Sequence, residues 1–444
     1  MEWDDLSLHH LKKMFFHYVS NSVIGMAGLS FNVFTDTFFI ANGIGSHALA
    51  PLNVALPMFS FVSAMAIMSA MGCATRYALL KAGKHDKEAD AVFAHGLVAA
   101  LLQSLLLLVA GLFFTRPLAV LLGANEAIAA DTAQYLFPLL TLGFLFQFNQ
   151  LFICMIRNDN APALAMKAMV IGNLVNIVLD YVFIYHFHWG LFGASLASCF
   201  SPLTSLLILS THKLRHRNHF HWHKPKWTLA LLGSIYRIGI PSFINEISSG
   251  IVMLAFNYLL LKYGGNTAIA AYGIIANLAL IIQAIYSGIG QGIQPIISHL
   301  YGSGQISLSF QTARYAVVTA ASLGILFVGI AFLFPTQLIA IFNSDHNAAL
   351  EAIAKTGIQL YSPAFLVAGI SVSLTSFFSS IHAVNESTIL SLGRGIIFVL
   401  CFLLLLPPFF EQNGVWLSIP AAEWLSFFIA CYFLIRIYRR LYQK

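Results

Sequence analysis

Long apolar segments recur along this sequence of 444 residues, and each is long enough to cross a lipid bilayer. A transmembrane helix needs about 20 mostly apolar residues, because its backbone must satisfy its own hydrogen bonds within hydrocarbon. Hydrophobic residues make up 59% of the chain and charged residues only 9%, which excludes an ordinary soluble domain. The sequence therefore predicts an all-α membrane protein with twelve transmembrane helices, at about residues 14–42, 48–79, 93–121, 131–156, 162–187, 190–211, 234–262, 268–300, 313–342, 352–381, 387–410 and 414–436.

The basic residues gather on one side of this predicted topology. Of the 23 lysines and arginines, all but Arg116, Lys262 and Lys355 fall in the loops that share a side with the termini. Cytoplasmic loops carry an excess of such residues, so both termini are expected in the cytoplasm. We expect a multi-pass protein of the bacterial plasma (inner) membrane, in contact with lipid. The net charge of +6 reflects this bias, and no nucleic-acid partner is expected.

The two halves of the chain repeat one another at an offset of about 220 residues. GSHALA at residues 45–50 parallels GNTAIA at 265–270, and YLFP at 135–138 parallels LYSP at 360–363. Such duplication is typical of secondary transporters, whose binding site lies where the repeats meet. We predict two six-helix lobes, at residues 1–211 and 233–444. Because six is an even number, the lobes should be related by rotation about the membrane normal.

A basic, histidine-rich linker at residues 212–232 joins the predicted lobes. Clustered histidines can bind metal. However, no acid or cysteine in the linker completes a recognisable ligand set. We therefore favour a cytoplasmic connector that meets anionic lipid headgroups through its lysines, arginines and tryptophans.

Polar residues form two stripes within apolar segments of the first half. In the fifth segment, Asn173, Asn176 and Asp180 recur at i, i+3 and i+7, which places them on one helix face. A carboxylate in hydrocarbon is costly enough to indicate function by default, so this face must meet protein or a water-filled space. The first segment carries a second stripe, which comprises Asn21, Gly25, Gly28, Asn32 and Asp36.

The second half places its acids differently. Glu246 lies near the start of the seventh segment, where it either lines the inner mouth of a cavity or reaches the interface. Glu423, in the twelfth segment, fits a structural hydrogen bond as well as a functional role. The eighth segment carries Asn277 and Gln283 among several glycines, which is typical of a bent helix that lines a cavity.

Four motifs resemble those of the multidrug and toxic compound extrusion (MATE) transporters. They are TDTFFIANGIG at residues 35–45, NIVLD at 176–180, GASLAS at 193–198 and GIQPIISHLYG at 292–302. The resemblance implies a V of two lobes around a central cavity. It also implies an antiporter that exports small, amphipathic, mainly cationic organic compounds by alternating access, driven by inflow of H⁺ or Na⁺.

The resemblance also assigns roles to individual positions. It implies a cation-coupling site, and possible Na⁺ ligands, at Asp36, Asn176, Asp180 and Ser198. No cofactor other than the coupling ion is expected, and the protein is expected to be a monomer. Together with the polar stripes, the resemblance indicates a substrate cavity lined by Tyr135, Asn32, Asn173, Gln147, Gln150, Glu246, Asn277 and Gln283.

Three other classes of protein were weighed against this interpretation. An intramembrane enzyme that holds Mg²⁺ on a diphosphate needs clustered acids, and the sequence near Asp159 supplies only one. A channel is disfavoured because nothing resembles a selectivity filter. A flippase of lipid-linked oligosaccharides is the main alternative, but it requires several cations at membrane depth. Arg394 is the nearest candidate in this sequence.

Overall fold

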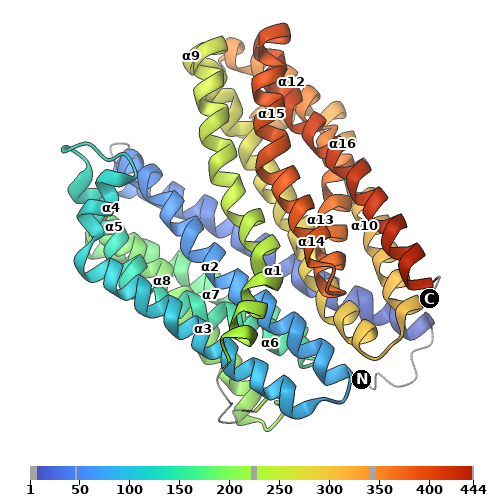
Figure 1. Ribbon diagram of the computed structural model, residues 1–444. Coiled ribbons are helices and arrows are strands. Elements are labelled where there is room, and N and C mark those ends of the chain that lie inside the picture. Colours follow the sequence, from blue (N-terminus) through green and yellow to red (C-terminus); the bar gives the residue numbers. More distant parts are fainter. Residues whose placement is uncertain (1–7, 46–47, 222–227, 341–346, 443–444) are drawn as a thin grey trace.

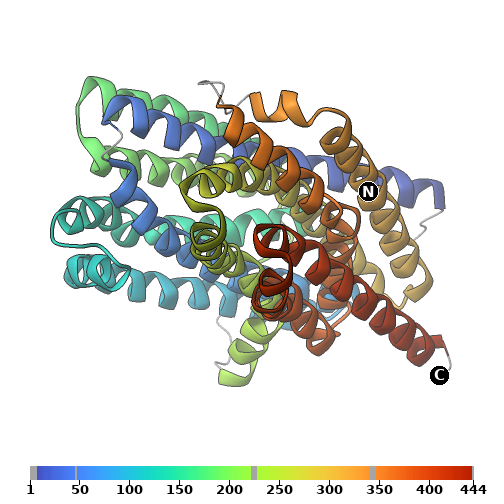
Figure 2. The same cartoon turned by 90° about the horizontal axis from the view of Figure 1, so that it is seen from above.

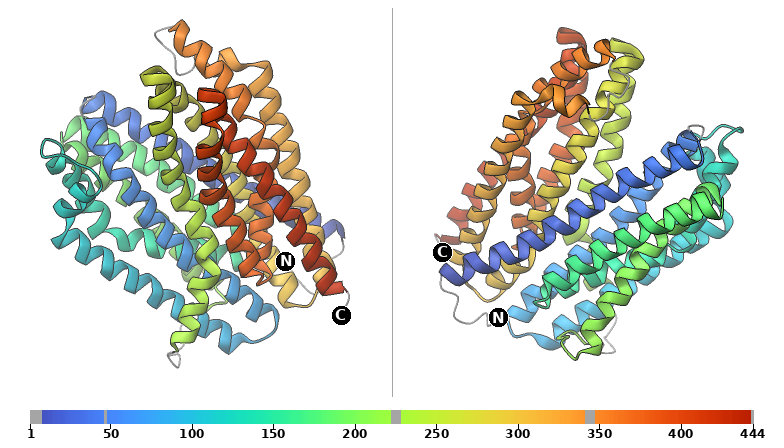
Figure 3. Two further views of the ribbon diagram at one scale, coloured as in Figure 1. Left: turned by 45° about the horizontal axis from the view of Figure 1, so that its top comes forward. Right: turned by 180° about the vertical axis from the view of Figure 1, so that it is seen from behind.

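The computed structural model describes residues 8–45, 48–221, 228–340 and 347–442. Its helices form two bundles that lie close together at the end carrying both termini and diverge toward the opposite end (Figures 1 and 3). We call the bundles the N-lobe and the C-lobe, and the two ends the terminal face and the far face. The predicted V of two helical lobes is therefore confirmed.

The N-lobe is built from helices whose ends follow local sequence signals. Pro162 stands in the first turn of α7, where its missing N–H leaves no bond unmade. Gly190 begins α8 with φ = 55°, a conformation that suits glycine. The elements are α1 (Leu8–Gly43), α2 (Leu49–Ala82), α3 (Asp86–Phe113), α4 (Thr115–Leu121), α5 (Ala129–Thr141), α6 (Gly143–Asn158), α7 (Pro162–Tyr181), the π-helical turn η2 (Val182–His186) and α8 (Gly190–Leu214).

The C-lobe repeats this order. Asn347 caps α12 by accepting bonds from the N–H groups of Ala349 and Leu350 at 3.0 and 3.2 Å. The elements are α9 (Leu229–Gly302), α10 (Ile306–Leu333), α11 (Pro335–Ala340), α12 (Ala348–Tyr361), α13 (Ala364–Ser380), α14 (Val384–Leu392), the π-helical turn η3 (Gly393–Ile397), α15 (Phe398–Leu405) and α16 (Pro407–Tyr442).

Twelve spans arise within the described residues when each bent helix pair counts as one span. The pairs α5–α6 and α12–α13 are both bent by 47°, and α9 is two spans joined at Gly265, where φ is 67°. For two of the spans, the range predicted from the sequence extends past the end of the observed helix at the far face. Residues 93–121 and 313–342 both divide, because α3 stops at Phe113 and α10 at Leu333, and short helices beginning at Thr115 and Pro335 follow. The break recurs at the same place in each lobe.

Glycines allow the lobes to pack closely at the terminal face. A Cβ on Gly239 of α9 would overlap the backbone of Met68 in α2, and a Cβ on Gly72 would overlap the backbone of Ile235. A Cβ on Gly288 would lie 2.6 Å from the Cα of Val23 in α1. Small residues permit such backbone contact between membrane helices. The lobe interface therefore depends on these glycines.

The first helix belongs to both lobes. Figure 2 shows that α1 runs from the N-lobe to the C-lobe, where its first turns lie beside α10. The rings of Phe15 and Tyr315 are 5.7 Å apart there, and Leu11 and Met14 pack against Ile296. Farther along, α1 packs against α7, where Gly25 faces Met169 and Gly28 faces Asn173. A shift of α1 would therefore change packing contacts in both lobes.

The described part of the linker docks onto the N-lobe. Asp159 accepts hydrogen bonds from the linker residue His219, through Nδ1 at 2.8 Å and the backbone N–H at 3.0 Å, and from His212 Nε2 at the end of α8 at 2.8 Å. The linker is also shorter than predicted, because α8 continues to Leu214 and α9 begins at Leu229. Within the described residues no group of three histidines, cysteines or acids is arranged to hold a metal ion. Residues 222–227 lie outside the described part of the chain.

We expect Gly239→Ala to push the lobes apart at the terminal face, because the new methyl group meets backbone atoms of Met68 that cannot give way. The measurement is the distance between spin labels at Lys84 and Ser303 in a background free of other cysteines. Gly250→Ala is the matched control, since a Cβ there meets nothing within 4 Å. Equal distances in the two variants would contradict this account of the interface.

Candidate functional site

Three helices of the N-lobe bring the predicted acids together. The stripe on α7 faces α1 and α8, and it is sealed from solvent: Asn176 and Asp180 are both 0% exposed. Gly172 lets α8 approach, because a Cβ there would lie 2.7 Å from the Ser201 carbonyl oxygen. Asn32 from α1 is also buried. The stripes therefore meet inside one lobe, and not in the space between the lobes.

Asp36 and Asp180 lie in hydrogen-bonding contact with each other. Asn176 joins this pair to α8, with its amide oriented to satisfy the surrounding groups. In that orientation its nitrogen donates to Asp36 Oδ1 at 2.9 Å, and its oxygen accepts from the backbone N–H of Ser198 at 3.0 Å. Two carboxylates can share a hydrogen bond only when a proton lies between them. The geometry thus suits a group that holds or releases one positive charge.

Hydroxyl groups complete the cluster. The Ser198 side chain lies beside Asp36 and also beside Tyr135, which comes from α5 and is buried. The structure therefore brings together all four residues expected to couple a cation, with Asn32 and Tyr135 beside them. We call these six residues the carboxylate cluster.

One position in the carboxylate cluster has room for a further bond. Asp180 Oδ1 is buried and has no hydrogen-bond partner in the described part of the chain. Carboxylate, amide and hydroxyl oxygens are the ligands that hard cations prefer. The residues present therefore fit a proton or a Na⁺ ion, with Asp180 Oδ1, Asp36, Ser198 and the amide oxygen of Asn32 as the available donors of electron pairs, whereas the Asn176 oxygen already accepts from the Ser198 backbone.

The residues expected to line a substrate cavity are spread more widely. Gln150, Glu246, Asn277 and Gln283 are all partly exposed, and Asn277 donates within its own helix to Gly273 O at 2.8 Å. Gln147 lies inside the N-lobe instead: it is 0% exposed and donates to Val62 O at 3.1 Å.

Asn173 is also buried, although it was expected to line the same cavity. It accepts a hydrogen bond from Ser201 Oγ at 3.3 Å. Its amide nitrogen has no partner in the described part of the chain. Asn173 and Gln147 therefore lie within the N-lobe, and the exposed candidates are Gln150, Glu246, Asn277 and Gln283.

The C-lobe has a buried ion pair that the sequence did not predict. Arg394 donates to Glu423 through Nη2 at 2.8 Å and Nε at 3.3 Å, and both residues are 7% exposed. The two-point geometry gives Glu423 a structural partner. The repeat could not indicate it, because neither residue has a charged counterpart in the first half.

A second arginine, Arg157, was expected in a loop but is buried between the lobes. It donates to Gln291 Oε1 of α9 at 2.6 Å, and its neighbour Asn158 donates to Gln294 Oε1 at 3.2 Å. The polar residues of the eighth span therefore help to hold the lobes together near the terminal face.

The fold has two helical lobes and up to twelve spans, and one lobe holds two contacting carboxylates, Asp36 and Asp180. These features define a class of polytopic α-helical membrane proteins. The MatE family profile matches residues 22–182 and 241–403, and the chain belongs to this family.

Curated relatives support the assignment. The multidrug export protein MepA of Staphylococcus saprophyticus is 25% identical over 391 residues, covering 86% of this chain and 82% of that protein. MepA of Staphylococcus haemolyticus is 24% identical over 409 residues, covering 91% and 89%.

Solved structures share the fold. The outward-facing conformation of a multidrug resistance MATE family transporter of the MOP superfamily matches with a TM-score of 0.91 at 21% identity, covering 98% of this chain and 97% of that one. A MOP superfamily transporter from Pyrococcus furiosus matches with a TM-score of 0.89 at 22% identity, covering 97% and 96%.

We expect Glu423→Gln to lower the unfolding temperature substantially, because it leaves the Arg394 guanidinium buried without its carboxylate. Breaking a buried ion pair from one side costs about 3–5 kcal/mol. Fluorescence of the buried Trp416 in detergent reports the transition. The double variant Arg394→Met/Glu423→Leu should recover most of the loss. A single variant as stable as the parent would show that this pair does not hold the C-lobe together.

Proposed function

We propose that this protein is a cation-coupled antiporter, which exports drug-like and mainly cationic organic compounds across the plasma membrane in exchange for H⁺ or Na⁺. Its relatives named multidrug export proteins support export of such compounds. The observation that supports the coupling mechanism is the contact in the N-lobe between the partly exposed Asp36 and the fully buried Asp180, beside Asn176 and Ser198.

The energy available to such a site is sufficient for export. One charge that moves inward through 100 mV gains about 2.3 kcal/mol, and each pH unit adds about 1.4 kcal/mol. One inward cation therefore sustains roughly a hundredfold outward gradient of a neutral substrate. The buried acids give that cation a defined place to bind during the cycle.

Coupling to the substrate path runs through α1 in this proposal. Asp36 lies in the second half of α1, whereas Val19 and Val23 in its first half pack against Gly292 and Gly288 of the C-lobe. A change of charge at Asp36 alters the packing of α1 against α7. The same helix then transmits the change to the lobe interface. With the termini in the cytoplasm, the V described above is the outward-open form.

The buried charges also weigh against the flippase alternative. Such a protein needs free cations at membrane depth to hold a diphosphate. Arg394, the nearest candidate, is already engaged by Glu423. Transport of a cationic dye and of a lipid-linked diphosphate by the same proteoliposomes distinguishes the two functions.

Asp36→Asn and Asp180→Asn should each abolish gradient-driven efflux, because Asn keeps the volume of Asp but binds neither H⁺ nor Na⁺ as a carboxylate does. Ethidium efflux from proteoliposomes under separately imposed pH and Na⁺ gradients measures this. Asp131→Asn is the control, since Asp131 lies in the first turn of α5 and is not among the residues that contact the pair. Efflux close to the parent rate in both site variants would remove the carboxylate cluster from the mechanism.

Glu246→Gln should weaken export of cationic substrates more than export of neutral ones. A partly exposed carboxylate attracts a nearby cation but offers a neutral molecule no comparable gain. Apparent KM values for ethidium and for a neutral dye of similar size provide the comparison. If both KM values rise equally, Glu246 plays no role in selecting charge.

A further inference from the structure

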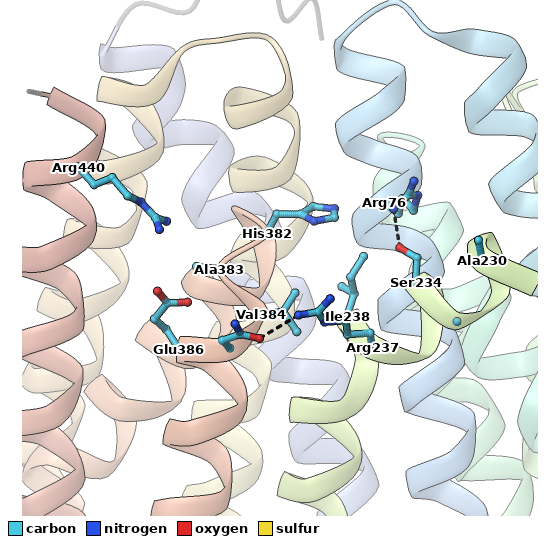
Figure 4. Close-up of a pocket in the computed structure, with 12 residues that line it drawn as sticks. Arg76, Ala230, Ser234, Arg237, Ile238, His382, Ala383, Val384, Glu386 and Arg440 are labelled. Atoms are coloured by element: carbon cyan, nitrogen blue, oxygen red, sulfur yellow. Dashed lines mark hydrogen bonds between the residues drawn. The ribbon is translucent and has the colours of Figure 1, made fainter. Parts of the chain in front are cut away.

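A second polar site lies at the terminal face, and it shares no residue with the carboxylate cluster of α1, α5, α7 and α8. It is a cavity of about 610 Å³ between the lobes (Figure 4). Arg76 of α2 is the lining residue that comes from the N-lobe. The rest of the wall comes from the C-lobe, at the start of α9, the turn at His382, α14 and the end of α16. The lining residues are Arg76, Ala230, Gly233, Ser234, Arg237, Ile238, His382, Ala383, Val384, Asn385, Glu386 and Arg440.

The charge of this cavity is strongly positive. Three guanidinium groups, on Arg76, Arg237 and Arg440, face a single carboxylate on Glu386. None of the three arginines forms an ion pair within the described residues. Figure 4 shows their side chains entering the cavity from three separate helices. A positive charge this concentrated favours an anion.

The hydrogen bonds of these arginines leave donors available. Arg76 Nη1 donates to Ser234 Oγ, but its buried Nε has no partner within the described residues. Arg237 Nη2 donates to Asn385 Oδ1 at 3.1 Å, which uses only one of its five N–H groups. The cavity therefore combines an excess of positive charge with N–H donors that have no acceptor within the described residues.

His382 adds a neutral polar group to the wall. It is exposed to the cavity mouth and adopts φ = 65°, which turns the chain sharply between α13 and α14. The pKa of His382 lies below its usual value, mainly because the ring is partly desolvated and secondly because the positive charge of Arg76 is nearby. His382 thus offers an uncharged ring nitrogen at neutral pH, and Glu386 is the one acidic residue among the described residues that line the cavity.

We propose that this cavity binds a phosphate group, presented by the headgroup of an anionic lipid or by a free phosphate ion. Guanidinium groups match phosphate oxygens in charge and in two-point hydrogen-bond geometry. Basic pockets between membrane helices on the cytoplasmic side are suited to anionic headgroups. The cationic substrates of the proposed export reaction are repelled here, so the cavity is a separate site.

The bound anion stabilises the form in which the lobes meet at the terminal face. Arg76 comes from one lobe, whereas Arg237 and Arg440 come from the other. Without an anion, these like charges oppose each other across the interface. An anion that binds both sides removes this repulsion, and by linkage it favours the converged form. This effect on conformation rests on the proposed alternating access, whereas the binding itself does not.

Binding is tested with the purified full chain in neutral detergent. Calorimetric titration with inorganic phosphate, against a chloride control of equal ionic strength, should yield one site in the parent protein. Arg237→Gln and Arg440→Gln should each weaken that affinity at least tenfold. Arg439→Gln should leave it unchanged, because this neighbouring exposed arginine does not line the cavity. All three side chains are exposed, so loss of folding does not confuse the comparison.

The source of the phosphate is tested in nanodiscs of phosphatidylglycerol or phosphatidylcholine. Native mass spectrometry should show one retained phosphatidylglycerol that Arg237→Gln and Arg440→Gln lose and Arg439→Gln keeps, if the lipid is the ligand. Phosphate binding without lipid retention identifies the free ion. Absence of both, or equal binding by all variants, overturns the proposal.

The conformational effect has its own readout. Spin labels at Lys84 and Ser303 should report a larger converged population when the phosphate source is present in the parent, and no change in Arg237→Gln. An unchanged distance in a protein that binds the anion overturns the effect on conformation alone. None of these three experiments measures substrate transport. A negative result in any of them is therefore distinct from a failure of the proposed export function.

Discussion

The free-energy cost of placing Asp36 and Asp180 inside a helical bundle constrains the rest of this protein. A carboxylate in hydrocarbon is tolerated only when it is paired, protonated or bound to a cation. Here the two acids contact each other, and Asn176 and Ser198 supply neighbouring polar groups. Without a guanidinium or ammonium group in this contact set, a proton or a metal cation must balance the charge. Under the proposed mechanism, the carboxylate cluster therefore links the stability of the N-lobe to the binding of a cation.

The two lobes share an architecture but treat buried charge in opposite ways. The C-lobe pairs Glu423 with Arg394 at 2.8 Å, so its charge is balanced within the protein. The N-lobe acids contact each other without a basic partner, and in the proposed mechanism an external cation balances their charge. The duplicated scaffold thus combines one lobe whose acids lack a basic partner in their contact set with one lobe whose buried acid has such a partner. The first helix joins them, because it carries Asp36 and also packs against α9 and α10.

The sequence predicted the main features of the fold because hydrophobic length and repetition are local signals. The twelve spans, the two lobes and the meeting of Asp36, Asn176 and Asp180 all followed from spacing or from the family motifs. The division of two spans at their far ends was missed, since apolar residues continue through Phe113 and Leu333 into the short helices beyond. The pairing of Arg394 with Glu423 and the burial of Arg157 were missed because they depend on contacts between distant helices.

The positions of the polar amide side chains also could not be predicted from the sequence alone. Helix periodicity indicates which residues share a face, but it does not say whether that face meets the other lobe or a neighbour within its own lobe. Gln147 and Asn173 are buried inside the N-lobe, whereas Gln150 and Gln283 retain exposed surface. Only the packing of complete bundles separates these cases.

The central claim is that the Asp36–Asp180 pair binds one exchangeable cation. Infrared difference spectroscopy of the purified protein tests it most directly, by comparing spectra recorded with and without ethidium or Na⁺. The account predicts a protonated-carboxyl band that changes when either ligand binds and that is absent from Asp36→Asn/Asp180→Asn. A spectrum in which neither ligand alters such a band, or in which the double variant retains the same change, would contradict it.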